Sequence, residues 1–143
     1  MLNHNLMTHR LSPGMDWEKT KRAEECRNMP SRDYEKPDDV VSFDRESSLA
    51  LSSISYPEEL SHIQVKKGME SVPVEYSLKE FDAPEQRFCP ANVYEYVKGD
   101  GENVELKIHN ENCLQCKACV VKTPKQFVKW TVPSSGGPNY SNM

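Results

Sequence analysis

The sequence contains no long apolar run. Its most apolar windows, at 40–43 and 49–56, are short and the second is interrupted by serine, whereas a membrane-spanning helix needs about 20 apolar residues in succession. Residues 1–15 also lack the apolar core of a secretory signal. They carry no acidic residue, and we interpret them as a disordered or leader segment. We therefore expect neither a transmembrane span in this chain nor a secreted, disulfide-rich module.

The chain also lacks a block rich in lysine and arginine. Its 18 basic and 22 acidic residues give a net charge of −4, whereas nucleic-acid binding normally leaves a basic patch. Only 36% of the 143 residues are apolar, so we expect one small domain with a modest core. Such domains usually depend on disulfides, a metal or a partner surface. The five cysteines are therefore the feature to explain.

The first half of the chain is predicted to be an extended arm with little regular structure. Residues 16–37 are dense in charge and poor in apolar side chains, and one helical stretch is expected over 17–26. Asp44 is a favourable N-cap residue, so it predicts a short helix over 45–52. The sequence thus predicts only short helices before residue 53.

Regular structure is expected to increase towards the cysteines. The alternation at 62–66 indicates a strand, and the proline-bearing segment 72–84 is expected to be extended or turned. Period-two apolar residues on both sides of a Gly-Asp-Gly loop predict a β-hairpin, roughly 92–97 with 103–109.

The end of the chain carries three further signals. Thr123 followed by proline predicts a side-chain cap and at most one helical turn. The alternation over 128–132 predicts a last strand that packs over the hairpin, and 134–138 reads as a flexible tail. Together these elements predict an α+β fold.

Four of the five cysteines form a ligand pattern. Three are separated by successive two-residue spacings and one lies 24 residues upstream: Cys113, Cys116, Cys119 and Cys89. In bacterial ferredoxins such a run continues with a cysteine and a proline, and that cysteine serves a second cluster. Here Thr123 occupies that position. The pattern therefore favours a single 4Fe–4S cluster whose fourth ligand is Cys89.

Two other uses of the cysteines are weighed against a cluster. Structural zinc usually recruits two separated C-x2-C pairs, which the sequence lacks. Disulfides are disfavoured because three cysteines crowded into seven residues cannot pair easily with one another. Cys26 has no partner at ligand spacing and is interpreted as a free thiol.

The residues around the ligands bear on whether a cluster would be redox-active. Backbone N–H donors in the loop 114–118 are expected to set the potential more than nearby charge does. Four lysines could offset the negative charge of a cluster or simply form a solvated face: Lys117, Lys122, Lys125 and Lys129.

Two stretches of the sequence resemble a known family. Near the cysteines they are Glu85-Gln86-Arg87-Phe88-Cys89-Pro90-Ala91, Val93-Tyr94-Glu95, Asn112-Cys113, Cys116-Lys117 and Cys119, then Trp130, Val132-Pro133, Gly136-Gly137-Pro138 and Tyr140. Upstream they are Tyr34-Glu35-Lys36-Pro37-Asp38, Ser42-Phe43-Asp44, Ser47-Ser48 and Ala50-Leu51-Ser52. Over about 16–143 the chain thus resembles the C-terminal iron–sulfur region of electron transfer flavoprotein–ubiquinone oxidoreductase.

The resemblance implies a small ferredoxin-like iron–sulfur domain at 85–143 after a family-like arm at 16–84. It implies a quinone-reducing oxidoreductase that carries electrons from electron transfer flavoprotein to ubiquinone with FAD and one 4Fe–4S cluster. The implied location is peripheral, on the matrix side of the mitochondrial inner membrane or at a bacterial membrane. The residues that bind the cluster, through its irons, are then Cys89, Cys113, Cys116 and Cys119.

The chain lacks the rest of what that chemistry needs. It has no G-x-G-x-x-G dinucleotide fingerprint, so FAD is expected on a partner or a missing domain. No catalytic residue is assigned to this chain. We interpret it as a fragment, a truncated product or a stand-alone ferredoxin-like subunit that meets its flavoprotein in trans.

Three positions near the ligands matter for tuning. Relatives usually have threonine where this chain has Ala118, which implies a lower reduction potential here. They usually have glycine where this chain has Asn92, a substitution that suits a positive φ. Tyr94 keeps the family's phenol and is either a donor to the cluster or a hairpin tyrosine half-buried on the core.

Two functions remain open at this point. The first is an electron relay, with Tyr94 and Lys117 as tuning neighbours of the cluster. The second is a non-catalytic accessory module, in which a metal staples a small fold that serves a larger complex.

Overall fold

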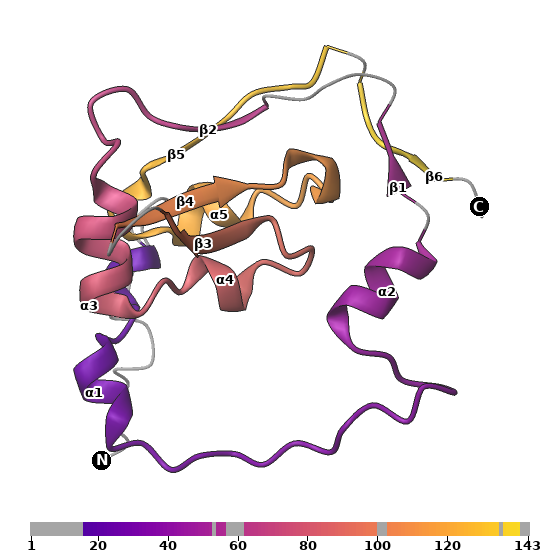
Figure 1. Cartoon of the computed structure of the whole chain (residues 1–143), viewed down its shortest axis with the longest axis horizontal. Coiled ribbons are helices and arrows are strands. Elements are labelled where there is room, and N and C mark those ends of the chain that lie inside the picture. Colours follow the sequence, from indigo (N-terminus) through magenta and orange to yellow (C-terminus); the bar gives the residue numbers. More distant parts are fainter. Residues whose placement is uncertain (1–15, 53, 57–61, 100–102, 135, 141–143) are drawn as a thin grey trace, which may run out of the picture.

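The computed structural model of the chain describes residues 16–52, 54–56, 62–99, 103–134 and 136–140. In these ranges short helices accompany three separate pairs of antiparallel strands, which confirms the α+β fold (Figure 1). The helical segments are η1 (Asp16–Lys19), α1 (Ala23–Arg27), α2 (Arg45–Leu51), η2 (Pro73–Leu78), α3 (Lys79–Phe81), α4 (Glu85–Phe88), η3 (Asn110–Asn112), α5 (Ala118–Lys122) and η4 (Pro124–Gln126). The strands are β1 (Ile54–Ser55), β2 (Ile63–Val65), β3 (Tyr94–Lys98), β4 (Val104–Ile108), β5 (Val128–Trp130) and β6 (Asn139–Tyr140).

The predicted hairpin forms the centre of the molecule. β3 and β4 pair from Tyr94 opposite Ile108 to Lys98 opposite Val104. Gly99 N–H donates to the carbonyl of Asn103 at 2.8 Å and closes the turn side of the pair. The tip, 100–102, lies outside the described residues. Because side chains alternate along a strand, Tyr94 is fully buried while Glu95 faces solvent.

The other two strand pairs join distant parts of the sequence. β2 pairs with β5, with Ile63 opposite Trp130, and β1 pairs with β6, with Ile54 opposite Tyr140. The strand expected over 128–132 therefore ends at Trp130 and bonds to β2. The buried core lies between this pair and the hairpin and consists of Ile63, Ala91, Val93, Tyr94, Phe127 and Val128 together with three cysteines.

The prediction that the segment 72–84 is extended or turned was wrong. This segment is helical over Pro73–Phe81. Pro73 stands at the start of the helix, where its missing N–H has no helical partner to lose. Pro73, Ser77 and Phe81 are buried, and their four-residue spacing places them on one helix face.

The N-terminal arm departs less from its prediction. The expected helix over 17–26 is two shorter ones, η1 and α1. Residues 28–44 then run along one edge of the molecule, away from the hairpin, to α2 (Figure 1). Asp44 caps α2, as predicted, by accepting from the backbone N–H groups of Glu46 and Ser47 at 2.9 Å each.

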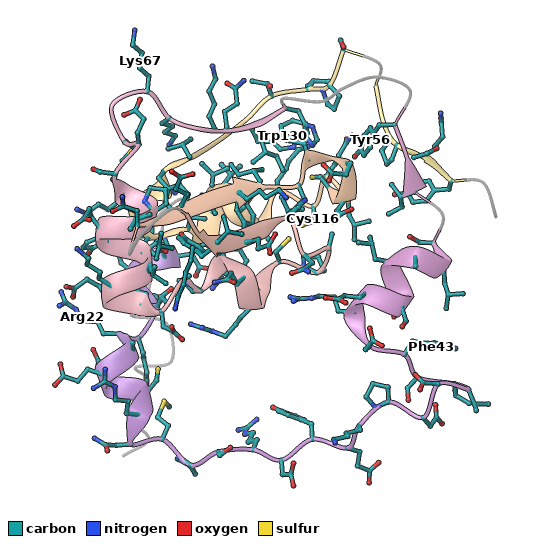
Figure 2. The ribbon with its side chains drawn as sticks, viewed as in Figure 1. Arg22, Phe43, Tyr56, Lys67, Cys116 and Trp130 are labelled. Carbon is teal, nitrogen blue, oxygen red and sulfur yellow. The ribbon has the colours of Figure 1, made fainter. Side chains whose placement is uncertain are left out.

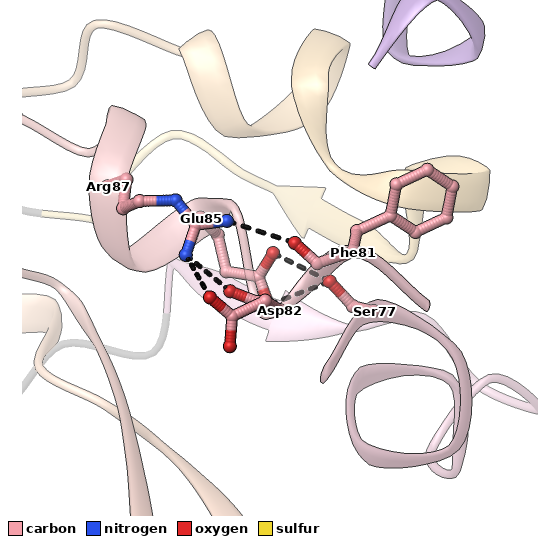
Figure 3. Close-up of polar contacts among 5 residues, drawn as sticks. All are labelled: Ser77, Phe81, Asp82, Glu85 and Arg87. Atoms are coloured by element: carbon pink, nitrogen blue, oxygen red, sulfur yellow. Dashed lines mark hydrogen bonds and ion pairs between the residues drawn. The ribbon is translucent and has the colours of Figure 1, made fainter. Parts of the chain in front are cut away.

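A buried carboxylate joins η2 to the helix that carries Cys89. Glu85, at the start of α4, is fully buried. It accepts bonds from the Ser77 hydroxyl at 3.0 and 2.7 Å and from the hydroxyl of Tyr96 on β3. Figure 3 shows Ser77 and Glu85 facing each other from two helices. Because an unpaired buried carboxylate is costly, these bonds hold α4 against η2 and the hairpin.

Arg87 secures the turn between α3 and α4. Its guanidinium donates to the carbonyls of Phe81 and Asp82 and pairs with the Asp82 carboxylate at 2.8 Å (Figure 3). The turn itself bends at Asp82 and Ala83, which both have positive φ. None of the helices in the described ranges is long and apolar enough to cross a membrane.

Candidate metal centre

The structure places four of the cysteines around one pocket. Cys89, Cys113, Cys116 and Cys119 all line this pocket. Its remaining lining is almost entirely apolar, with Val93, Leu114 and Trp130 among its walls. Cys26 is exposed and lies elsewhere, in a groove between α1 and α3. The four residues expected together are therefore brought together, and the fifth cysteine is not.

Short helices adjoin three of the four pocket cysteines, and Cys116 lies in the loop between two of them. Cys89 ends α4, and its N–H donates to the carbonyl of Glu85 at 3.2 Å. Cys113 follows η3, whose Asn110 side chain accepts from the N–H of Ile63 at 2.9 Å. Cys119 lies in the first turn of α5. Cys89, Cys113 and Cys119 are buried and Cys116 is exposed, so Cys116 is the pocket cysteine that solvent reaches.

The loop between Cys113 and Cys119 wraps around the pocket through two left-handed residues. Gln115 and Lys117 have φ of 56° and 60°. Left-handed residues between ordinary ones aim successive N–H groups towards one side and create an anion-binding concavity. One such group, Gln115 N–H, lies 3.3 Å from the Cys113 sulfur. This contact agrees with the expectation of backbone donors in 114–118.

Thr123 closes the same region in an unexpected way. The short segment η4 follows it, but Lys125 and Gln126 within η4 have φ of 55° and 51°, so this is not the regular helical turn that was expected, and Thr123 makes no side-chain cap for it. Instead its buried hydroxyl donates to the carbonyl of Cys119 at 2.8 Å. The Thr123 N–H donates to the same carbonyl at 3.1 Å, so both groups of Thr123 tie the end of α5 back to Cys119.

Burial makes the metal-free thiols poor acids. It raises the pKa of the Cys113 thiol to about 11, against an ordinary value of 9, and it also raises the pKa of Cys119. The nearby Tyr94 side chain acts in the opposite direction and lowers the pKa of Cys119. A metal binds the thiolate form, so loading this pocket must release protons.

The metal-free chain is expected to lose stability at alkaline pH. Because the pKa of Cys113 is higher in the fold, folding favours the protonated thiol; that stabilisation is complete below about pH 9 and disappears as the pH rises through about 11. At about 1.4 kcal/mol per pKa unit, this thiol accounts for a loss of roughly 3 kcal/mol. Urea unfolding at pH 8 and above pH 10, followed by circular dichroism in reductant and chelator, measures it.

Cys113→Ala is the matched variant for this measurement. It lacks the titrating thiol, so its pH dependence should be shallower than that of the wild-type chain. Equal slopes for the two proteins would contradict the assignment.

Tyr94 and Ala118 both line the pocket. Tyr94 is 1% exposed. It is therefore fully buried, and not the half-buried hairpin tyrosine that was one of the two interpretations of the sequence. Its hydroxyl has no well-formed hydrogen bond within the described part of the chain, but it is near enough to Cys119 to lower the pKa of that thiol. Asn92, three residues after Cys89, has φ of +51°, which is the condition under which asparagine suits this position.

The structure disperses the four lysines. Only Lys117 lines the pocket, and its ammonium lies 4.5 Å from the centre of the Trp130 ring. Lys122 pairs with Asp16, and Lys125 lies over the Tyr76 ring. Lys129 is exposed on β5. The fold therefore does not gather the four lysines around the pocket, where they could together balance the charge of a cluster.

An aromatic wall beside the pocket gave no signal in the sequence. Trp130 packs edge-on against His62, which also contacts Tyr56, and the Tyr56 hydroxyl donates to the carbonyl of Cys113. Burial lowers the pKa of His62, so its ring is neutral at pH 7. Figure 2 labels Tyr56, Trp130 and Cys116 in this region. The contact of Tyr56 with Cys113 spans 57 positions, and no local pattern could have revealed it.

The pocket suits a cluster. The four cysteines line one largely apolar pocket, and a cubane takes one sulfur ligand on each of its irons. The Tyr94 hydroxyl and the Gln115 N–H are donors available to sulfur at its edge.

Comparison with known proteins identifies the class of this domain. Residues 39–141 match a family described as "Electron transfer flavoprotein-ubiquinone oxidoreductase, 4Fe-4S". The chain therefore belongs to this 4Fe–4S family, and the resemblance seen in the sequence is confirmed.

Individual relatives agree. The chain is 41% identical over 133 residues to the mitochondrial electron transfer flavoprotein-ubiquinone oxidoreductase of Homo sapiens, covering 91% of this chain and 21% of that protein. It is 42% identical to the enzyme of Pseudomonas aeruginosa, over 90% of this chain and 23% of that protein. It is 44% identical to the mitochondrial enzyme of Arabidopsis thaliana, over 77% and 17%. The chain thus spans about a fifth of the length of these relatives.

Proposed function

We propose that this chain binds one 4Fe–4S cluster and carries single electrons through it. The proposed ligands, of cluster and iron alike, are Cys89, Cys113, Cys116 and Cys119. One observation carries the proposal: four thiols, three from the loop 113–119 and one from the end of α4, line a single apolar pocket. The match to a 4Fe–4S family supports the same assignment.

The residues of the chain have distinct tasks in this proposal. The bound cluster supplies a one-electron acceptor and donor. The apolar walls, including Val93 and Trp130, keep water from the buried ligands. Gln115 N–H and the Tyr94 hydroxyl donate towards sulfur and stabilise negative charge there. Exposed Cys116 leaves one corner close to the surface, where an electron can enter or leave.

We further propose that the chain works within a quinone-reducing oxidoreductase. The relatives are named for electron transfer flavoprotein and ubiquinone, and these are the proposed electron donor and final acceptor. FAD belongs, in this proposal, to a partner subunit or a domain outside this chain. The proposed location is peripheral at the mitochondrial inner membrane on the matrix side, or at a bacterial membrane.

Anaerobic purification followed by iron, sulfide and zinc analysis tests the proposal. About four irons per chain are expected, with a reduced-cubane signal in low-temperature EPR after dithionite treatment. Zinc, or no metal, would overturn the cluster assignment. Iron at this ratio with no reducible signal would favour the second function, a metal-stapled accessory module. Because three of the proposed ligands lie in the buried core, a bound cluster would stabilise the fold under either function. Stability alone therefore does not distinguish the electron relay from the accessory module.

Ala118→Thr is expected to raise the reduction potential. Ala118 lines the pocket one residue before Cys119, and a hydroxyl there could donate to the cluster and stabilise its reduced form. A hydrogen bond of about 1 kcal/mol corresponds to roughly 40 mV for one electron. Ala118→Val has a similar shape without the hydroxyl and serves as the control. A potential in redox titration that stays or falls in Ala118→Thr would contradict the expectation.

A further inference from the structure

Arg45 reaches from the arm to the loop that carries Cys89. It is the first residue of α2, 44 positions before the cysteine. One guanidinium nitrogen donates to the carbonyl of Gln86 at 2.7 Å and to that of Cys89 at 3.2 Å. The other donates to the side-chain oxygen of Asn92 at 3.0 Å. A single side chain thus holds three acceptors within seven residues of sequence.

Two of these acceptors are groups that need a partner. The last carbonyls of a helix have no partner within it, and arginine side chains often satisfy them. Gln86 lies within α4 and Cys89 is its C-cap residue, so Arg45 closes the end of this four-residue helix. A helix this short has little stability of its own. Its far end is held by the buried Glu85, and Arg45 holds the end that bears the ligand.

The third acceptor fixes the chain after the ligand. Asn92 is left-handed, with φ of +51°, and there the backbone turns into the hairpin. By binding Asn92 as well as Cys89, the planar guanidinium fork constrains both sides of the Cys89-Pro90-Ala91 bend.

Arg45 belongs to none of the ion pairs among the residues that the structure describes. Its cationic group lies against the Cys89 carbonyl, and the acceptors that it binds in this part of the chain are neutral. A nearby positive charge favours the state that carries one more electron.

We propose that Arg45 is a positioning residue for the cluster: it holds Cys89 in place through the end of α4 and favours the reduced state through its charge. The inference rests on the proposed function, because Cys89 is taken as a ligand. In the step concerned, the cluster gains one electron from dithionite or a redox mediator, and no proton or bond changes partner.

Three variants of the full chain separate the two effects. Arg45→Met keeps the stem but removes the charge and all three bonds. Arg45→Lys keeps the charge but cannot reproduce the fork. Arg22→Met is the matched control, because Arg22 also makes a long-range contact, a surface ion pair with Glu80 at 2.7 Å, on an element away from the pocket (Figure 2).

Two measurements on the cluster-loaded chain test the proposal. In Arg45→Met, the ratio of reduced to oxidised cluster at a fixed potential should fall roughly threefold. Because a tenfold change corresponds to 59 mV for one electron, the reduction potential should fall by about half of that value. Cluster loss to a chelator should be several times faster. Arg45→Lys should keep the wild-type potential but still lose its cluster quickly, and Arg22→Met should change neither. Wild-type potential and retention in Arg45→Met would overturn the proposal.

A third measurement does not depend on the cluster. In the metal-free chain, hydrogen exchange at the amides of Phe88 and Cys89, which bond back to Pro84 and Glu85, should accelerate in Arg45→Met and not in Arg22→Met. If the wild-type chain binds no cluster but shows this difference, the proposed function fails while the anchoring of the loop stands. If these amides exchange at equal rates in the wild-type chain, Arg45→Met and Arg22→Met, the anchoring of the loop by Arg45 is refuted.

Discussion

Replacing Cys113 with alanine is expected to abolish cluster binding. Cys113 is buried, lines the pocket and receives the N–H of Gln115 at 3.3 Å. It comes from the loop between η3 and α5, and each iron of a cubane needs its own protein ligand. We expect the variant to retain well under one iron per chain and to give no reduced-cubane signal. Iron analysis and EPR after identical anaerobic preparation measure both effects.

Cys26→Ala is the matched control for this loss. Cys26 is the one cysteine outside the pocket, exposed on α1. Its removal should leave iron content and the EPR signal as in the wild type. Full iron content in Cys113→Ala, or loss of iron in Cys26→Ala, would show that the ligand set is wrong.

Glu85→Ala is expected to give the largest loss of stability among single changes outside the ligands. The carboxylate is fully buried, and the Ser77 and Tyr96 hydroxyls both donate to it. Truncation removes the acceptor of the buried Ser77 hydroxyl, at about 1–3 kcal/mol for an unpaired buried group, and it also opens a cavity. The half-buried Tyr96 hydroxyl keeps the Pro73 carbonyl, 3.2 Å away, as an acceptor. We expect the free energy of unfolding to fall by roughly 3 kcal/mol, measured by urea denaturation.

Glu80→Ala provides the comparison for Glu85→Ala. Glu80 lies on the neighbouring helix α3, and its side chain is 41% exposed while it pairs with Arg22. Surface ion pairs contribute little, so this variant should lose less than about 1 kcal/mol. Similar losses in the two variants would mean that burial of Glu85 is not what stabilises the joint between α4 and η2.

Local patterns predicted much of the fold correctly. The Asp44 cap and the hairpin of β3 and β4 each depend on residues a few positions apart. Such features form from the intrinsic preferences of adjacent residues and need no distant contact. The error over 72–84 had a local cause as well. Pro73 indicated a break in structure, whereas proline in the first turn is compatible with a helix.

The candidate site was also largely predictable, because its ligands follow a motif. The sequence indicated four candidate ligands: three by their spacing, Cys113, Cys116 and Cys119, and one, Cys89, by the proline that follows it. The fold brings those four to one pocket. The assignment of Tyr94 could not be made in the same way. Its position on the buried face of β3 depends on which side of the hairpin meets the core.

The sequence by itself determined the class of this domain, its family and its candidate ligands, since these depend on residue type and short spacing. Only the tertiary structure decided what surrounds those ligands. Tyr56 meets Cys113 across 57 positions, Arg45 meets Cys89 across 44, and β2 pairs with β5. Closing such long loops costs chain entropy that only the assembled core offsets. Because each of these contacts depends on the packing of the whole domain, no short stretch of sequence encodes it.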